Sequence, residues 1–269
     1  MIASTGNARV RAAAALVKKA KARREAHCFV VEGPRMFAEL PAGWRREVFV
    51  SESFLAQEKR AQKLLEGCAY ETVSDGVMEY LSDTRTPQGI LAVAKMPDYS
   101  LEEVLGPGKD GRPPLLIFLE KLQDPGNLGT ILRAGEGAGM TGLVMDAQTA
   151  DIYNPKVIRS TMGSVFRMPF VCVPDLEPAL GEAKRRGIRL LAAHLKGSVS
   201  YDCEDCRGPV GFLIGNEAAG LGEKAAGMAD ARIHIPMAGR VESLNAAVAA
   251  SVLLFETARQ RRTDAGRKA

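Results

Sequence analysis

The sequence contains no run of about 20 apolar residues, the length that a helix needs to span a bilayer. Its first 26 residues, MIASTGNARVRAAAALVKKAKARREA, have cationic side chains within their apolar stretch, unlike a secretory signal. An ordered pattern continues beyond this basic start, which argues against a mitochondrial transit peptide. We therefore expect a cytoplasmic protein with no membrane partner.

Cysteine and histidine are too few and too scattered to indicate a disulfide framework or a metal site. Five cysteines, an odd number, suit a reducing compartment in which thiols stay free. Cys203 and Cys206 form one C-x-x-C pair, but a structural zinc site needs a second pair or nearby histidines. His27, His194 and His234 are far apart in the sequence. We expect no metal and interpret the cysteine pair as incidental.

The sequence does contain enough apolar residues for a substantial core. Of its 269 residues, 46% are hydrophobic and 25% are charged, which argues against wholesale disorder. This length suits one large domain or two small ones. The net charge is +4 and the pI is about 8.8, so an RNA partner is permitted but not required.

Positive charge gathers near the N-terminus. Residues 4–25 have the pattern of a basic amphipathic helix, which Ser4 or Thr5 can cap. The helix dipole alone favours cations in the last turns, but five in seven residues exceed what it requires. The five side chains either contact RNA phosphates or form a solvated helix end. They are Lys18, Lys19, Lys21, Arg23 and Arg24.

Residues 1–95 alternate short strand-like and helical segments, which predicts a small α/β domain. Strands are expected at 27–32, 47–51, 70–73 and 89–94, with helices at 35–40 and 54–66. Residues 96–114 (MPDYSLEEVLGPGKDGRPP) lack periodicity and are rich in proline and glycine in their second half. We interpret them as a linker.

Residues 115–269 have the pattern of a parallel sheet covered by helices on both faces. Six apolar strands, expected at 115–120, 142–146, 170–173, 188–194, 210–215 and 231–236, alternate with helices at 124–139, 154–162 and 175–187. A last helix is expected from 243 to about 261. Ligands bind such sheets at the carboxyl ends of the strands. The site should therefore lie in the loops after 115–119, 190–194, 211–215 and 232–236.

Four polar, glycine-containing stretches adjoin these strands, and each has an ordinary structural explanation. Asn127, Asn154 and Asn245 can cap helices, Arg133 can be a solvated side chain, and Glu217 can begin a helix. The glycine spacing does not match the dinucleotide fingerprint, and no Gly-Lys-Ser/Thr phosphate loop occurs. This disfavours a nucleotide-binding oxidoreductase. The stretches are 124–139 (DPGNLGTILRAGEGAG), 154–169 (NPKVIRSTMGSVFRMP), 212–221 (FLIGNEAAGL) and 233–255 (IHIPMAGRVESLNAAVAASVLLF).

Taken together and in this order, the four stretches resemble the motifs of the SpoU (TrmH-like) RNA methyltransferases of the SPOUT class. The family pattern Asn-Leu-Gly-x-x-x-Arg matches 127–133, and Asn-Pro-Lys…Arg…Ser/Thr-Met-Gly matches 154–163. Gly-x-Glu-x-x-Gly matches 215–220, and Ile-Pro-Met…Ser-Leu-Asn ends at 245. Ala134 and Gly135 depart from the Thr and Ala that many members carry, without disturbing the chemistry. Residues 4–95 also resemble the family's RNA-binding domain, around Asn7, at Phe29…Glu32-Gly33 and at Pro87-Gln88-Gly89.

The resemblance implies a catalytic domain with a deep trefoil knot, preceded by an L30e-like RNA-binding domain, in a homodimer with its active site near the interface. The knot loops would bind S-adenosylmethionine, with backbone groups on adenine and apolar side chains beside it. The implied cofactor residues are Leu195, Gly197, Ile214, Gly215, Asn216, Ile235, Met237, Ser243, Leu244 and Ala247. The implied RNA-binding residues are Asn7, Arg35 and the basic cluster.

The implied reaction is methylation of a ribose 2′-hydroxyl, with the central role assigned to Arg133. A guanidinium holds its proton too strongly to be a ready base. We therefore favour a version in which Arg133 binds the neighbouring phosphate and stabilises negative charge on the oxygen. Asn127, Glu217, Ser243 and Asn245 would orient the ribose and the loop around it.

The alternatives concern the substrate and the activity itself. The separate N-terminal domain resembles those of enzymes that act on large-subunit rRNA, so this substrate is favoured over tRNA, and an unpaired loop nucleotide is the expected target. A non-catalytic RNA-binding or ribosome-assembly factor could share the scaffold. Substitution of Arg133, Asn127 or residues 243–245 would have favoured that alternative, and none is substituted.

Overall fold

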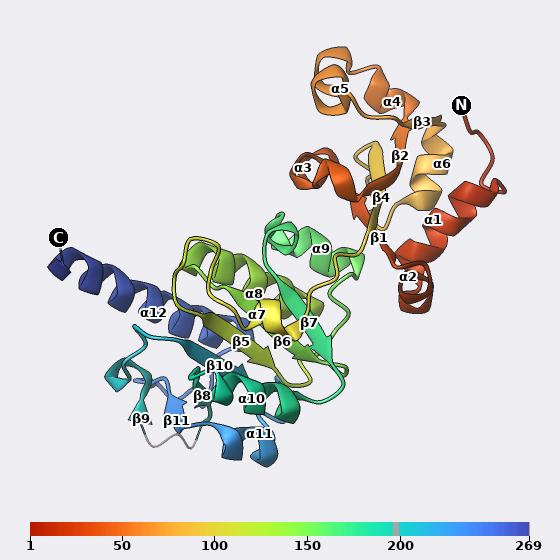
Figure 1. The fold of residues 1–269 in the computed structure, drawn as a ribbon. Helices are drawn as coiled ribbons and strands as arrows, with labels where there is room; N and C mark the ends of the chain where they lie inside the picture. The colour runs from red at the N-terminus through yellow and green to blue at the C-terminus, as the bar shows by residue number, and fades with distance from the viewer. Residues whose placement is uncertain (196–198, 269) are drawn as a thin grey trace. The chain divides into compact units, whose positions relative to one another are not determined.

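The computed structural model describes residues 1–195 and 199–268, which form two compact units (Figure 1). The first comprises Met1–Asp98 and Asp151–Phe166, and the second comprises Tyr99–Ala150 and the chain from Arg167 onward. Residues 151–166, which were expected with the second domain, are thus part of the first unit.

A four-stranded sheet in the order β1-β4-β2-β3 forms the centre of the first unit. β4 (Ile90–Lys95) pairs antiparallel with β1 (Cys28–Glu32) and β2 (Arg45–Ser51), and β2 pairs parallel with β3 (Glu71–Val73). The helices of this unit are α1 (Ala8–Lys18), α2 (Ala20–Ala26), α3 (Pro34–Glu39), α4 (Glu52–Leu55), α5 (Glu58–Leu65), α6 (Asp75–Leu81) and α9 (Pro155–Thr161).

Two apolar groups hold the first unit together. Val10 of α1 and Val77 of α6 belong to one buried cluster with Phe49 of β2. The segment 151–166 packs through aromatic rings: the Phe29 centroid lies 4.9 Å from that of Tyr153 and 6.4 Å from that of Phe166. Strand β1 is therefore covered by residues more than 120 positions further along the chain.

The N-terminal helix differs from its prediction. The chain breaks at Lys19, whose φ of −129° and ψ of 115° are extended, so two helices replace one. Asn7 caps α1 by accepting hydrogen bonds from the backbone N–H groups of Arg9 and Val10, and the predicted cap at Ser4 or Thr5 is wrong. Helix α6, capped by Ser74, was not predicted because its seven residues give too short a pattern.

The second unit contains the predicted parallel sheet, in the order β7-β6-β5-β10-β8-β11-β9. Residues of β5, β6 and β10 are buried throughout, as expected of strands covered on both faces. The strands are β5 (Leu115–Leu119), β6 (Gly142–Asp146), β7 (Phe170–Val173), β8 (Arg189–Ala193), β9 (Val199–Ser200), β10 (Val210–Ile214) and β11 (Ala231–His234).

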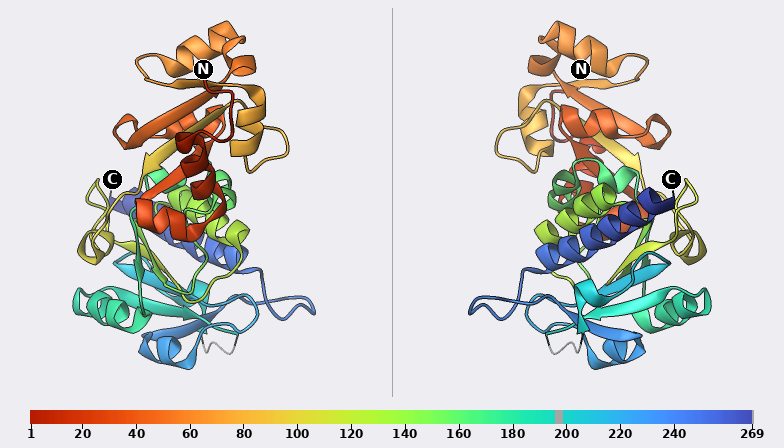
Figure 2. Two further views of the ribbon diagram at one scale, coloured as in Figure 1. Left: turned by 90° about the vertical axis from the view of Figure 1, so that its right-hand side faces the viewer. Right: turned by 90° about the vertical axis from the view of Figure 1, so that its left-hand side faces the viewer.

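Helices cover both faces of this sheet. Helices α7 (Leu101–Val104), α10 (Leu176–Arg185) and α11 (Glu223–Met228) share a core with one face, and α8 (Pro125–Ala138) and α12 (Ala246–Lys268) pack together on the other (Figure 1). Figure 2 shows the segment between β11 and α12 standing away from the sheet. Among the described residues, no helix is long and apolar enough to cross a bilayer.

The stretch predicted as a linker is only partly irregular. Within it, Ser100 and Glu103 form a capping box that starts α7. Val104 and Leu105 are fully buried in the core of the second unit. The prediction failed here because a single helical turn gives no periodicity from which to recognise it.

Candidate functional site

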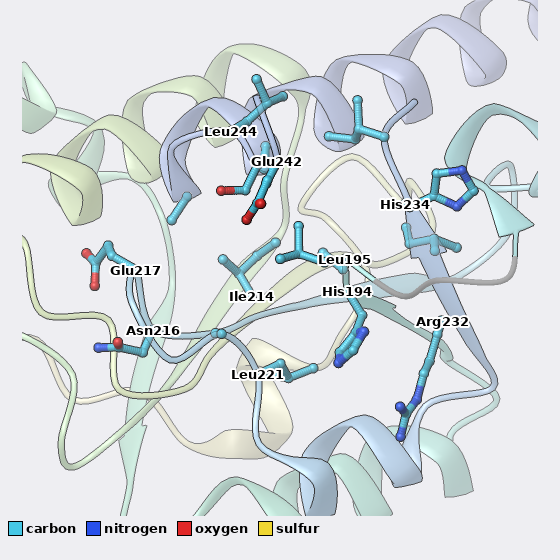
Figure 3. A pocket seen from close by; sticks show the side chains of 18 of the residues that line it. His194, Leu195, Ile214, Asn216, Glu217, Leu221, Arg232, His234, Glu242 and Leu244 are labelled. Atoms are coloured by element: carbon cyan, nitrogen blue, oxygen red, sulfur yellow. The ribbon is translucent and has the colours of Figure 1, made fainter. Parts of the chain in front are cut away.

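A cavity of about 600 Å³ lies at the carboxyl ends of β8, β10 and β11, within the second unit (Figure 3). The segments that follow these three strands line it, together with the start of α12. Its volume suits a cofactor-sized ligand. Three of the four predicted loops, those after 190–194, 211–215 and 232–236, therefore line one cavity, whereas the loop after 115–119 does not line it.

Most of the residues implied for the cofactor line this cavity. Figure 3 shows Leu195, Ile214 and Leu244 in its middle, Asn216 and Glu217 on one side, and His194, Arg232 and His234 on the other. Ala247 is buried but does not line the cavity, and Gly197 lies outside the described residues. The implied residues that line it are Leu195, Ile214, Gly215, Asn216, Ile235, Met237, Ser243 and Leu244.

Five polar lining residues were not predicted. Arg232 and Glu223 pair at 2.7 Å between Nη2 and Oε2. Neither Glu223 nor Arg232 lies in one of the four stretches, although Arg232 lies on the predicted strand 231–236. His234 and Glu242 lie within the stretch 233–255, and His194 ends the predicted strand 188–194. The residues are His194, Glu223, Arg232, His234 and Glu242.

The turn after β10 requires glycine at its first position. A Cβ on Gly215 would lie 2.2 Å from backbone atoms of Gly220 and Leu221, closer than any real contact. The turn closes through paired hydrogen bonds between the backbones of Asn216 and Gly220, at 3.0 and 2.9 Å. The Asn216 amide donates to the carbonyl of Lys121 at 2.9 Å, which ties this turn to the one after β5.

Glu217 joins the same two turns. Its Oε1 accepts hydrogen bonds from the backbone N–H of Asp124 and from Nδ2 of Asn127, both at 2.9 Å. Its Oε2 accepts from the backbone N–H of Gln123 at 3.0 Å. In turn, Oδ1 of Asn127 accepts from Nδ2 of Asn245 at 2.9 Å. Three loops are thereby fixed to one carboxylate.

This carboxylate is held in its ionised form. Burial would raise the pKa of Glu217, but hydrogen bonds from Gln123, Asn127 and Asp124 outweigh it and lower that pKa below its usual value. A carboxylate with a lowered pKa and both oxygens engaged is a poor general base. Glu217 therefore serves to position the loops.

The same arrangement fixes the start of α12. Oδ1 of Asn245 accepts from the backbone N–H groups of Ala247 and Val248, at 2.9 and 3.3 Å. Asn245 thus caps the helix and also bonds to Asn127, so its interpretation as a cap and its interpretation as a site residue are compatible.

Arg133 stands apart from this network. Its side chain is exposed on α8 and has no hydrogen bond or ion pair among the residues that the structure describes. It does not line the cavity, and neither do Asn127 and Asn245, whereas Glu217 and Ser243 do. The structure thus brings Asn127, Glu217 and Asn245 together and leaves Arg133 available for a negatively charged group.

Residues 114–255 match the SpoU rRNA methylase family, and residues 7–92 match the MRM3-like substrate binding domain. The chain belongs to the SpoU rRNA methylase family. This confirms the family predicted from the four motifs.

Relatives of this SpoU family member match it over nearly its full length. It is 31% identical over 236 residues to the 23S rRNA (guanosine(2553)-2'-O)-methyltransferase RlmP of Bacillus subtilis, covering 87% of this chain and 90% of the relative. It is 32% identical over 264 residues to a 23S rRNA (uridine(2479)-2'-O)-methyltransferase of Streptomyces viridochromogenes, covering 95% and 91%.

A solved structure of a SpoU methyltransferase is also similar to this chain. The SpoU methyltransferase AviRb of Streptomyces viridochromogenes, crystallised in complex with the cofactor AdoMet, superposes with a TM-score of 0.85 at 32% identity. The match covers 96% of this chain and 99% of AviRb.

The basic cluster of this SpoU protein is exposed, with one exception. Arg23 is buried: its guanidinium pairs with Asp151 at 2.6 Å and donates to the carbonyls of Leu16 and Val17. Its assignment to RNA contact is corrected, because a buried, fully engaged side chain cannot reach a phosphate. The exposed cations are Lys18, Lys19, Lys21, Arg24 and Arg35.

The remaining assignments have simple structural roles. The Asn7 oxygen is engaged in capping α1. Cys203 is exposed and Cys206 is buried, and burial raises the pKa of Cys206 to about 11. No group of three potential metal ligands occurs in the described ranges, 1–195 and 199–268.

Proposed function

We propose that this chain transfers a methyl group from S-adenosylmethionine to the ribose 2′-hydroxyl of a nucleotide in 23S rRNA. The observation that carries the proposal is full-length similarity to two 23S rRNA 2′-O-methyltransferases, which spans both units of the chain. The cavity at the strand ends supplies a place for the cofactor. Because these relatives match both units, rRNA is favoured over tRNA as the substrate.

The residues around the cavity fit S-adenosylmethionine. The apolar side chains of Leu195, Ile214 and Leu244 suit the faces of an adenine ring, and the glycine turn at 215–220 lets backbone groups approach it. Polar groups at both ends of the cavity suit the ribose and the amino acid part of the cofactor. When bound, S-adenosylmethionine supplies an electrophilic methyl group on a sulfonium.

The chain's own residues prepare the acceptor. The hydroxyl must lose its proton as it attacks, so negative charge develops on the oxygen. The guanidinium of Arg133 binds the adjoining phosphate, and its positive charge stabilises the negative charge on the oxygen. Asn127, Glu217 and Asn245 hold the surrounding loops, and Ser243 faces the cavity, where it orients the ribose.

We further propose that residues 1–95 are the RNA-binding domain, L30e-like in fold, and that 115–269 are the catalytic domain with its trefoil knot, although residues 151–166 pack with the first unit. The strand order, with β10 between β5 and β8, is compatible with such a knot. An rRNA substrate and free thiols both support a cytoplasmic location.

A homodimer is proposed from an exposed apolar stripe. Val248 and Phe255 are separated by two helical turns of α12, so they share a face, and they are 47% and 48% exposed. A second copy would cover this stripe. Since Arg133 does not line the cavity of its own chain, a site near such an interface gives it a place to act.

The deciding experiment is transfer of tritium from labelled S-adenosylmethionine to separate pools of deproteinised rRNA and tRNA, followed by nucleoside analysis. We expect a 2′-O-methyl nucleoside in 23S rRNA. Arg133→Ala should abolish transfer and leave cofactor affinity near normal. Label in tRNA alone would overturn the substrate, and absence of cofactor binding would favour the non-catalytic RNA-binding alternative.

A further inference from the structure

The first unit contains a second cavity, of about 640 Å³, that the proposed reaction does not use. Four segments line it: the end of β1 with the start of α3, the α4 turn, the turn before β4, and α9. All four belong to the first unit. The cavity therefore joins residues 32–36 and 87–89 to Arg159 and Met162, which come from the second family motif.

Two glycines create the hollow. Gly33 has a φ of +91°, and a Cβ there would lie 2.7 Å from Oε1 of Gln88. Gly89 has a φ of +78°, and a Cβ there would lie 2.5 Å from Cβ of Phe54. Both positions require glycine for their positive φ, and Gly89 also requires it for space, because Cβ of Phe54 cannot move aside as the end of the Gln88 side chain can.

Part of the lining is already committed to structure. The Glu32 carboxylate accepts hydrogen bonds from the hydroxyls of Ser82 and Thr84 and from the backbone N–H of Asp83. Nη2 of Arg159 donates to Asp83 at 2.8 Å, which fixes its guanidinium at the cavity wall. Glu32 and Asp83 therefore anchor the wall and leave little capacity to bind a ligand.

Other lining groups have atoms that are free to form further hydrogen bonds. Nη1 of Arg159 is buried without a hydrogen-bond partner and lies 3.9 Å from Oε2 of Glu32. The side chains of Gln57, Gln88 and Arg35 are exposed and make no hydrogen bond or ion pair with any described residue. The apolar part of the lining consists of Pro34, Met36, Phe54, Pro87 and Met162.

We propose that this cavity binds one unpaired nucleotide of the substrate RNA, distinct from the nucleotide that is methylated. The proposal rests on the proposed function, which supplies the RNA. Primary amides present both a donor and an acceptor to a base edge, as Gln57 and Gln88 do here. The guanidinium of Arg159 offers a plane for stacking, and that of Arg35 binds the phosphate. An extruded base needs a concave apolar wall with such groups at its rim.

The first test measures RNA affinity with the full chain. The probe is the shortest fragment of a 23S rRNA transcript that the wild type binds. Gln57→Ala combined with Gln88→Ala should raise the Kd for this fragment roughly tenfold, as expected from losing one or two hydrogen bonds. Cofactor affinity and the rate at saturating RNA should not change. Gln62→Ala and Arg46→Ala alter exposed residues of the same unit outside the cavity and serve as controls.

The second test distinguishes the cavity from general RNA affinity. A series of fragments, each lacking the base at one unpaired position, is bound to the wild type and to the Gln57/Gln88 double variant. At one position, we expect base removal to weaken wild-type binding and to leave the variant unaffected, because both changes delete the same interaction. Additive losses at every position, or equal losses in Gln62→Ala, would overturn the proposal. Binding without methyl transfer would instead refute the proposed function alone.

Discussion

Replacing Glu217 with glutamine tests whether one ionised carboxylate holds the three loops of the site. Glutamine keeps the shape of the side chain but replaces one acceptor oxygen with an NH₂ group. Both oxygens of Glu217 accept from N–H donors, so either orientation of the amide places two donors against each other. The Asn127 side chain or a backbone N–H then loses its partner.

The magnitude follows from those three hydrogen bonds. A hydrogen bond to a charged group contributes about 1.5–3 kcal/mol, and Glu217 is exposed enough for water to replace part of this. We expect Glu217→Gln to lower the free energy of unfolding of the second unit by about 1–2 kcal/mol. The rate of methyl transfer should fall roughly tenfold to a hundredfold, because the loops that present the acceptor are displaced.

The pH dependence of the free energy of unfolding provides an independent test. The lowered pKa of Glu217 means that its stabilisation is present above the ordinary carboxyl pKa and is lost as the pH falls through the folded-state value. Wild-type stability should therefore decline on the acid side more steeply than that of Glu217→Gln. Urea unfolding at several pH values between 3 and 7 measures the difference.

Glu120→Gln is the matched control. The Glu120 carboxylate directly follows β5 and accepts only one hydrogen bond among the described residues, from the backbone N–H of Gly222 at 2.6 Å. An amide oxygen can keep that bond, so stability and turnover should change little. The reasoning fails if Glu217→Gln matches the wild type in acid stability and turnover, or if Glu120→Gln loses as much.

Three further predictions concern single features. Arg23→Ala should lower the unfolding free energy by about 3 kcal/mol, since it breaks a buried ion pair, whereas the exposed neighbour Arg24→Ala should change it little in urea titrations. Gly215→Ala should abolish cofactor binding in calorimetry because its Cβ meets backbone, and Gly181→Ala, with open space around it, should bind normally. Neutralising the exposed cations Lys18, Lys19, Lys21 and Arg24 should reduce the slope of log affinity for RNA against log salt concentration by about 0.7 for each phosphate that is no longer bound. An unchanged slope would mean that these side chains are only a solvated helix end.

Six of the seven strands in the sheet of the second unit could be predicted to within two residues at each end, and β9 was missed. Fully buried parallel strands are uninterrupted apolar runs bounded by glycine, proline or polar residues, and β6 and β7 begin and end at the predicted positions. Helix ends were less accurate, because α12 begins at Ala246 after Asn245, not at Ser243. A polar residue that can cap a helix does not by itself fix the helix start.

Side-chain partnerships were beyond prediction. The cluster of cations gave no sign that Arg23 would turn inward, because the sequence pattern does not reveal that Asp151, 128 positions away, lies beside it. The motifs named Asn127, Glu217 and Asn245 as site residues, but their hydrogen bonds to one another depend on strand order. Parallel pairing of β5 with β10 brings Asn127 and Glu217 together across 90 positions.

The second family motif illustrates why motif and domain boundaries need not coincide. Its helix α9 and the residues around it pack on the sheet of the first unit, where Phe29 meets Tyr153 and Phe166, and Trp44 meets Phe166. A fragment ending at Asp98 would leave these aromatic side chains uncovered and would lack the partner of Arg23. The first unit is therefore completed only when the chain has passed through β5, α8 and β6 of the second unit. Because the two units are interleaved in sequence, the second family motif supplies Arg159 and Met162 to the wall of a cavity in the first unit.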